Sequence, residues 1–360
     1  MRKRLLVLVG MAVLTQGSAT HAQATQEGKP KKERKVMAPK EKRDSSHFFD
    51  SADPLKLTLT ANLKQLKKDK AAESPWRAAR LSYSGADGTP VSLPLKVRTR
   101  GIWRLKNCDF PPLRLNFVKD SVKHTLFAKQ DKPKLVTHCR DNDEFEQYVL
   151  QEYQLYRIYN LLTPYSHKAR LARATYTDSA TGAAAATRYG ILIEDADELA
   201  ERVGGLNLAQ KGAGPNDAHP FHQTVFSLFQ YLIGNTDWSI AGLHNVEVLA
   251  VDTTIVPIAF DFDFAGAVDT RYATVDPRLS VKRVRDRLYR GYCAPPDEYP
   301  RVFALFNSKK DSIVALYRDS IGALLKPDIA RETVAYFEEF YKTINDPRRA
   351  KYSIIEACLR

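Results

Sequence analysis

Residues 221–263 read FHQTVFSLFQYLIGNTDWSIAGLHNVEVLAVDTTIVPIAFDFD, and this stretch decides the predicted fold. Its first part, 221–233, carries apolar residues at helical spacing. Two later runs, 246–251 and 255–260, have the composition of β-strands, and the short turn between them predicts a β-hairpin. A helix that leads into a hairpin is typical of an α+β domain rather than of a regularly alternating one.

The rest of the chain extends this pattern in both directions. Alternating apolar residues predict further strands at 55–59, 93–97, 113–117, 134–137 and 187–194. Apolar stripes predict helices at about 143–162, 301–325 and 327–345. Strands and helices do not alternate regularly, so the predicted fold class is α+β, with a mainly antiparallel sheet.

The first 24 residues have the three parts of a cleavable signal peptide. Arg2, Lys3 and Arg4 precede a ten-residue apolar run, and Ala22-Gln23-Ala24 fits the cleavage pattern. A helix needs roughly 20 residues to span a bilayer, so the run is too short, and no later stretch is apolar for long enough. We therefore expect export to the periplasm or the cell exterior. The alternative is an uncleaved anchor or a buried N-terminal strand.

Residues 25–47 are strongly basic, with eight Lys or Arg against four acids and no Phe, Trp or Tyr. Such a composition cannot bury enough apolar surface to fold, which predicts a disordered cationic tether. We expect a solvated spacer. The alternative is weak contact with anionic envelope polymers or lipid headgroups. The net charge of +13 does not indicate a nucleic-acid partner here, because export separates the protein from most nucleic acid.

The remaining residues, 48–360, are enough for one large domain, which we expect to be monomeric. Their cysteines are Cys108, Cys139, Cys293 and Cys358. In an exported protein these predict up to two structural disulfides, with three connectivities left open, and their spacing matches no zinc pattern.

Two aspartates end the hairpin, in the run Phe260-Asp261-Phe262-Asp263. If this run is extended, Asp261 and Asp263 project to one face of the strand. Two neighbouring carboxylates repel each other unless a cation lies between or near them. Mg²⁺ with a bound phosphate is the cation we expect, so both aspartates are candidate metal ligands.

Asp237 and Asn245 lie between the second helix and the hairpin. An acid after a helix, then an asparagine, a hairpin and a second acid is the layout of a kinase centre. In that layout Asp237 is the catalytic acid and Asn245 a metal ligand. Seven residues separate the two here, against four in protein kinases, so the loop must bulge. The structural alternative is that each residue is a turn, capping or ion-pairing residue.

Glu152 falls on the apolar stripe of the predicted helix 143–162, where a carboxylate needs a partner. Kinases pair such a glutamate with a strand lysine that contacts the phosphates. Lys134 is the lysine we expect in this role, and Lys132 is the competing candidate. The alternatives are a purely structural salt bridge and a Glu152 that reaches solvent.

Arg100 and Gly101 begin a glycine turn after a predicted strand, within Arg98-Thr99-Arg100-Gly101-Ile102-Trp103-Arg104. Backbone and guanidinium donors in such a loop can approach an oligophosphate. The simpler interpretation is a solvated strand face. His138, His167 and His244 form no spaced ligand set, so we expect structural or surface roles for them.

These segments together resemble the spore-coat-protein-H-like (CotH) family of atypical secreted kinases. The resemblance covers about residues 95–265 and is best in Asn235-Thr236-Asp237 with Asn245 and in Asp261-Phe262-Asp263. It implies a distant protein-kinase-like fold, with a strand-rich N-lobe at about 48–194 and a helical C-lobe at about 195–360. It also implies ATP-dependent phosphoryl transfer with Mg²⁺ or Mn²⁺ to a protein or envelope component. Glu194 would then lie near the hinge that contacts the nucleotide.

Two other functions fit the same residues. One is a catalytically inactive kinase-fold protein that binds the envelope, which Ile102 in the glycine loop and the scarcity of ATP outside the cytoplasm favour. The other is a hydrolase that uses paired carboxylates, such as Asp237 with Asp261 or Asp263, on a glycan or phosphoester.

Overall fold

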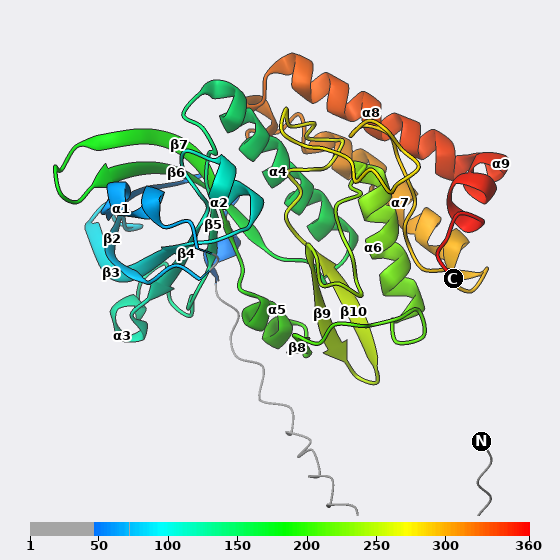
Figure 1. Ribbon diagram of the computed structural model, residues 1–360, viewed down its shortest axis with the longest axis horizontal. Helices are drawn as coiled ribbons and strands as arrows, with labels where there is room; N and C mark the ends of the chain where they lie inside the picture. Colours follow the sequence, from blue (N-terminus) through cyan, green and yellow to red (C-terminus); the bar gives the residue numbers. More distant parts are fainter. Residues whose placement is uncertain (1–46, 72) are drawn as a thin grey trace, which may run out of the picture. The chain divides into compact units, whose positions relative to one another are not determined.

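The computed structural model describes residues 47–71 and 73–360 (Figure 1). The predicted signal peptide and all but the last residue of the predicted tether lie outside the described residues. Within the described ranges, no helix is both long enough and apolar enough to cross a membrane. The fold is mixed α+β, as predicted, with most strands in the N-terminal part and the longest C-terminal elements helical.

Seven strands form a closed barrel in the order β1-β2-β3-β4-β5-β7-β6. Neighbouring strands are antiparallel, except that β1 and β6 pair in parallel and close the barrel. The strands are β1 (Leu55–Ala61), β2 (Arg77–Ser84), β3 (Pro90–Thr99), β4 (Leu113–Phe117), β5 (Lys134–Val136), β6 (Ala169–Asp178) and β7 (Ala184–Ile193). The mainly antiparallel sheet was predicted, but its closure was not.

The barrel interior is filled by alternate residues of its strands. In β1, Leu55 and Leu57 are buried, while Lys56 between them is exposed, and Leu59 continues the buried face. Side chains of successive strand residues point to opposite faces, so one face of each strand packs inward. This period-two pattern is the signal that identified β1 and β4 from the sequence.

A second, three-stranded sheet has the order β10-β9-β8 and contains the predicted hairpin. Its strands are β8 (Leu206–Leu208), β9 (Val246–Val251) and β10 (Thr254–Ala259). The helices are α1 (Leu63–Lys68), α2 (Trp103–Asn107), α3 (Lys119–Val122), α4 (Asp143–Leu162), α5 (Ala196–Arg202), α6 (Pro220–Ile233), α7 (Glu298–Ala315), α8 (Pro327–Asn345) and α9 (Pro347–Ala350). The predicted helix at 301–325 is thus shorter, because the chain turns after Ala315.

Helix α4 lies between the barrel and the C-terminal helices (Figure 1). Asn142 caps its N-terminus by accepting the Phe145 backbone N–H at 3.1 Å. The helix packs against β6 and β7 on one side and against α6 and α7 on the other. Apolar residues therefore surround it on both sides, and a charge at its middle is removed from water.

Two disulfides are present, Cys108–Cys139 in the N-terminal half of the domain and Cys293–Cys358 in its C-terminal part. They select one of the three connectivities that the sequence left open. Cys108–Cys139 ties the end of α2 to the segment that precedes α4. Both bonds are compatible with an oxidising compartment, as expected for an exported protein.

Candidate functional site

The loop that carries Asp237 begins where α6 ends. Gly234 caps the helix with a φ of 65°, and a Cβ atom there would lie 2.0 Å from the Tyr336 hydroxyl. Only glycine fits this position. Asn235, which is 1% exposed, then accepts the Asp237 backbone N–H at 3.0 Å and donates to Gln230 at 3.0 Å. The start of the loop is therefore fixed.

The structure brings the predicted residues Asp237 and Asn245 together. Nδ2 of Asn245 donates to the backbone oxygen of Asp237 at 2.8 Å and to its Oδ2 at 3.1 Å. Between them, Ser239 and His244 exchange two backbone hydrogen bonds of 2.9 and 3.0 Å. The predicted bulge is thus a tight hairpin, and the longer spacing does not separate the acid from the amide.

His244 is a residue of this site that the sequence analysis missed. Its Nε2 lies 2.7 Å from Oδ1 of Asp237, and its side chain is 53% exposed. The hydrogen bond to Asp237 outweighs partial burial and raises the pKa of His244. Histidine spacing gave no warning of this contact, and proximity to Asn245 in the chain was the one signal that could have found it.

Asp261 and Asp263 flank a phenylalanine that enters the core. Strand β10 ends at Ala259 and Asp261 has a φ of 65°, so the predicted extended run through both aspartates is wrong. The backbone N–H of Asp261 donates to the Tyr156 hydroxyl of α4 at 3.0 Å. Phe262 is fully buried, with its ring 4.7 Å from that of Tyr156. The chain therefore turns at Asp261, and Phe262 packs into the core.

Asp263 is buried, and its Oδ2 accepts the Tyr272 hydroxyl at 3.0 Å. Burial, followed by the negative charge of Asp261, raises the pKa of Asp263 to about 7, although Arg104 acts in the opposite direction. Asp237 also contributes to this rise. The charge of Asp237 therefore acts on Asp263 of the aspartate pair that follows the hairpin.

Glu152 of α4 is affected by the same aspartate pair. It is 1% exposed, and its Oε1 has no hydrogen-bond partner. Burial, and then the charges of Asp263 and Asp261, raise the pKa of Glu152 to about 8, against the opposing effect of Arg104. The sequence analysis identified this carboxylate as unusual, and the alternative that it reaches solvent is wrong.

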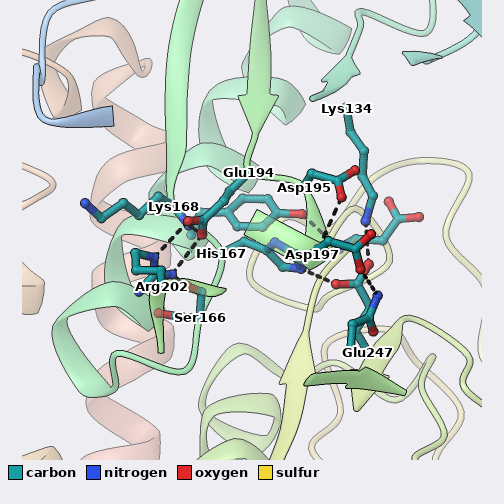
Figure 2. A network of polar contacts seen from close by, with 12 residues as sticks. Lys134, Ser166, His167, Lys168, Glu194, Asp195, Asp197, Arg202 and Glu247 are labelled. Carbon is teal, nitrogen blue, oxygen red and sulfur yellow. Dashed lines mark hydrogen bonds and ion pairs between the residues drawn. The ribbon is translucent and has the colours of Figure 1, made fainter. Parts of the chain in front are cut away.

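The predicted pairing of Lys134 with Glu152 is also wrong. Figure 2 shows Lys134 and His167 converging on Glu247 of β9. Lys134 Nζ donates to Oε1 of Glu247 at 2.7 Å, and His167 Nε2 lies 2.7 Å from its Oε2. The competing Lys132 pairs with its neighbour Asp131 at 2.9 Å. The place of β5 in the barrel therefore directs Lys134 toward the second sheet and not toward α4.

Arginines of the glycine loop and α2 supply the cations near Glu152. Arg104 is buried, and its Nη2 donates to the Thr137 backbone oxygen. Burial lowers the pKa of Arg104, but the charges of Tyr272, Asp263 and Glu152 outweigh it, so the pKa is raised. Arg104 belongs to the predicted glycine loop, but no role at the site was predicted for it.

Arg100 and Gly101 form the predicted turn at the end of β3. Gly101 has a φ of 90°, which favours glycine. Arg100 lowers the pKa of Glu152, although less than burial and the two aspartates raise it. Nε of Arg100 and Nε of Arg104 are both buried without a hydrogen-bond partner. Both guanidinium groups thus retain an unsatisfied donor.

Glu194, the predicted hinge residue, has a structural partner. Arg202 donates to both of its carboxylate oxygens at 2.8 Å (Figure 2), and the Lys168 backbone N–H donates at 3.0 Å. The same arginine donates to the Ser166 backbone oxygen at 2.8 Å. This network joins the end of β7 to α5 and to the segment before β6, which explains why an acid is buried there.

The acid cluster, defined here as Glu152, Asp261 and Asp263, has the donor chemistry that Mg²⁺ or Mn²⁺ requires. Carboxylate and amide oxygens are preferred by these ions, and Asn245 donates through Nδ2, which leaves its amide oxygen for a cation. In the described part of the chain, no three His, Cys, Asp or Glu side chains form a ready-made ligand group. Mg²⁺ is commonly held by one or two carboxylates plus phosphate oxygens, so the acid cluster fits that mode better than an all-protein cage.

No protein-family model matches the chain, and no curated protein sequence matches it significantly.

Proposed function

We propose that this chain is an exported phosphotransferase with a distant protein-kinase-like arrangement. It uses ATP and Mg²⁺ or Mn²⁺ to phosphorylate a hydroxyl group of a protein or envelope component. The order of the functional residues supports the proposal: Asp237 and Asn245 precede the hairpin, and the aspartate pair follows it. Protein kinases present a catalytic aspartate, an asparagine and a metal-binding aspartate in this same order.

The observation that carries the proposal is the incomplete pairing of the acid cluster. Glu152 has a buried oxygen without a partner, and Asp263 is buried beside Asp261. A buried carboxylate without a partner is costly, so such a group is retained only where something offsets the cost. A divalent cation bound with an oligophosphate would offset it, since it adds positive charge next to all three carboxylates.

Each residue of the site then has a definable task. Asp237, with 38% of its side chain exposed, accepts the proton of the acceptor hydroxyl as that oxygen bonds to the terminal phosphorus and the bond to the leaving diphosphate breaks. His244 and Asn245 hold the carboxylate of Asp237 in position through its two oxygens. Arg100 and Arg104 provide donors for phosphate oxygens. The metal ion, when bound, neutralises charge that develops on the transferred group.

One observation favours the non-catalytic alternative. Lys134, the expected phosphate-binding lysine, is committed to Glu247 at 2.7 Å. A chain without that lysine on the phosphates can bind a nucleotide and still turn it over slowly or not at all. Binding and turnover must therefore be measured separately.

The test combines a thermal-shift titration with a turnover assay on the full secreted chain. Mg²⁺ or Mn²⁺ with a nonhydrolysable ATP analogue should raise the Tm of the wild type. Asp261→Asn should weaken this binding at least about 10-fold, because it removes a carboxylate ligand. Asp237→Asn should keep binding but lower self-phosphorylation or ATP hydrolysis by about 10²–10⁴-fold.

Asp311→Asn, an exposed acid on α7, is the control and should change neither readout. Nucleotide binding without turnover in the wild type would favour the non-catalytic alternative. A wild-type Tm that responds to no combination of nucleotide and divalent cation would contradict the proposal.

A further inference from the structure

Two hollows open on either side of the end of α2. Asn107 lines both of them, with Cys139 in the first and Cys108 in the second. The Cys108–Cys139 disulfide and Asn107 therefore form the ridge between two adjoining recesses. Neither recess contains a residue of the acid cluster, so they are a separate feature of this surface.

The first hollow has a volume of about 280 Å³ and combines aromatic walls with cations. Trp103, Phe145 and Tyr272 form the walls, and Arg140 and Arg271 add two guanidinium groups. Aromatic faces pack well against the apolar stem of a side chain, while a guanidinium group binds a carboxylate with two parallel hydrogen bonds. A glutamate or aspartate side chain fits this combination.

The second hollow, of about 640 Å³, has three lysines among its lining residues. Lys67, Lys70 and Lys106 contribute positive charge, and Asp109 and Asp141 are the acids among the lining residues. Arg188 already pairs with Asp141 at 2.7 Å. The positive charge of this hollow is therefore opposed mainly by Asp109.

Among the described residues, most of the cations that line the two hollows have no carboxylate partner. Within the described ranges, Lys67, Lys106 and Arg140 have no carboxylate oxygen within 4.0 Å. Lys70 donates to the Cys108 backbone oxygen at 3.3 Å, and Arg271 pairs with Glu144 at 3.2 Å. These cations are exposed and lie close together, so they create a local field that attracts an anionic partner.

The first hollow adjoins the acid cluster through one residue. The ring of Tyr272 forms part of its wall and stacks on Trp103 at 4.7 Å, while the Tyr272 hydroxyl donates to Asp263 at 3.0 Å. A ligand in the hollow would thus lie one aromatic ring away from the candidate metal site. A chain bound there could present a neighbouring residue to the site.

We propose that the two adjoining hollows bind an acidic peptide segment of the phosphoryl acceptor, which makes them a specificity site for the proposed function and so rests on it. The separation of the cations over two recesses favours an extended chain that offers several carboxylates. The aromatic walls favour carboxylates on flexible apolar stems, as in glutamate, over those attached directly to sugar rings.

The experiment measures binding of fluorescein-labelled peptides to the full chain by anisotropy, without ATP. The acidic probe is a serine flanked by glutamates, and the matched probes replace every glutamate with glutamine or lysine. The wild type should bind the glutamate peptide at least about 10-fold more tightly than the glutamine peptide at low salt. The difference should shrink in about 0.5 M NaCl, because salt screens these charges.

The double variant Lys67→Glu/Lys106→Glu should weaken binding of the glutamate peptide about 10-fold, because it replaces attraction with repulsion. Lys64→Glu/Lys119→Glu is the matched control, since both lysines are exposed and neither lines a hollow. It changes net charge equally and should alter binding by less than about twofold. Both double variants should keep the Tm response to Mg²⁺ and nucleotide, which separates this test from that of the proposed function.

Equal loss of binding in the two double variants would contradict a site at the hollows and leave only a general charge effect. Polygalacturonate that binds as tightly as the glutamate peptide, with the same dependence on Lys67 and Lys106, would contradict the peptide assignment in favour of an anionic glycan. Absence of nucleotide binding together with selective peptide binding would refute the proposed function but retain the acidic-peptide site.

Discussion

Glu247 and Glu152 are both withdrawn from water, yet their surroundings are opposite. Glu247 has Lys134 on one oxygen and His167 close to the other, both at 2.7 Å. Glu152 has an oxygen without a partner and two aspartates nearby. Burial raises the pKa of both, but Lys134 and His167 reverse its effect and lower the pKa of Glu247, whereas that of Glu152 rises to about 8.

The fold itself places positive or hydrogen-bonding groups beside Glu247, whereas it leaves an oxygen of Glu152 without a partner. The hydrogen bond from Lys134 and the 2.7 Å contact with His167 explain why Glu247 can be withdrawn from water. An incomplete group lowers stability, and natural sequences retain such groups chiefly where a ligand completes them. Glu152 is therefore the stronger indication of function, although the sequence alone made Lys134 equally attractive.

The largest expected effect is on the free energy of unfolding when Glu247 is replaced. Glu247→Gln should lower the free energy of unfolding at neutral pH by about 3–5 kcal/mol, because it leaves Lys134 buried without its counterion. The lowered pKa of Glu247 means that its contribution is present above the ordinary glutamate pKa of about 4.3 and is lost as the pH falls from there. Chemical denaturation at pH 7 and at pH 4 measures both effects.

Glu247→Leu combined with Lys134→Met is the informative companion to that variant. Replacing both partners with apolar groups of similar size should recover most of the lost stability. A single variant that unfolds with wild-type stability would show that the pair is not complete in solution, and the comparison would fail.

A smaller effect concerns the disulfide beside α2. Cys108→Ser/Cys139→Ser should cost about 2–4 kcal/mol, as should the control Cys293→Ser/Cys358→Ser. Only the first pair anchors α2, which carries Arg104 to the acid cluster. The Tm response to Mg²⁺ and nucleotide should therefore decline in the first variant and persist in the control. An equal response in both would show that Arg104 is positioned without the disulfide.

The smallest effect has the opposite sign. Glu152→Gln should raise the free energy of unfolding at pH 8, without divalent cations, by about 1–3 kcal/mol. A raised carboxyl pKa lowers stability as the pH rises from about 4.3 toward the folded-state pKa, so the gain should shrink at lower pH. Denaturation series at several pH values measure it, with the exposed Glu332→Gln as control. A destabilised Glu152→Gln would mean that the carboxylate has a partner in solution.

The sequence was most informative where local pattern determines structure. Leu57 and Leu59 identified a strand by alternation, and the stripe around Glu152 identified α4 with its correct ends. The closure of the barrel was not predictable in this way. It depends on pairs such as Leu57 with Ala174, which are more than a hundred positions apart and carry no local signal.

In the site, too, features with a local sequence signal were predictable, and features that depend on contacts between distant residues were not. Order along the chain was enough to expect Asp237 near Asn245 and both near Asp261. The partner of Glu152 was not predictable, because the direction of Lys134 depends on where β5 lies relative to β9. His244 was missed for a related reason: its contact with Asp237 requires the tight hairpin that begins at Ser239.

Two main-chain hydrogen bonds have a consequence for how this site can change over generations. Gly266 donates to Gly234 at 3.1 Å, and Ala267 donates to Ile233 at 2.9 Å, which ties the end of α6 to the segment after Asp263. Backbone bonds of this kind do not depend on which side chains surround them. A descendant that lost its acids would inherit the same scaffold, and one that regained them would have a framework already in place for new chemistry.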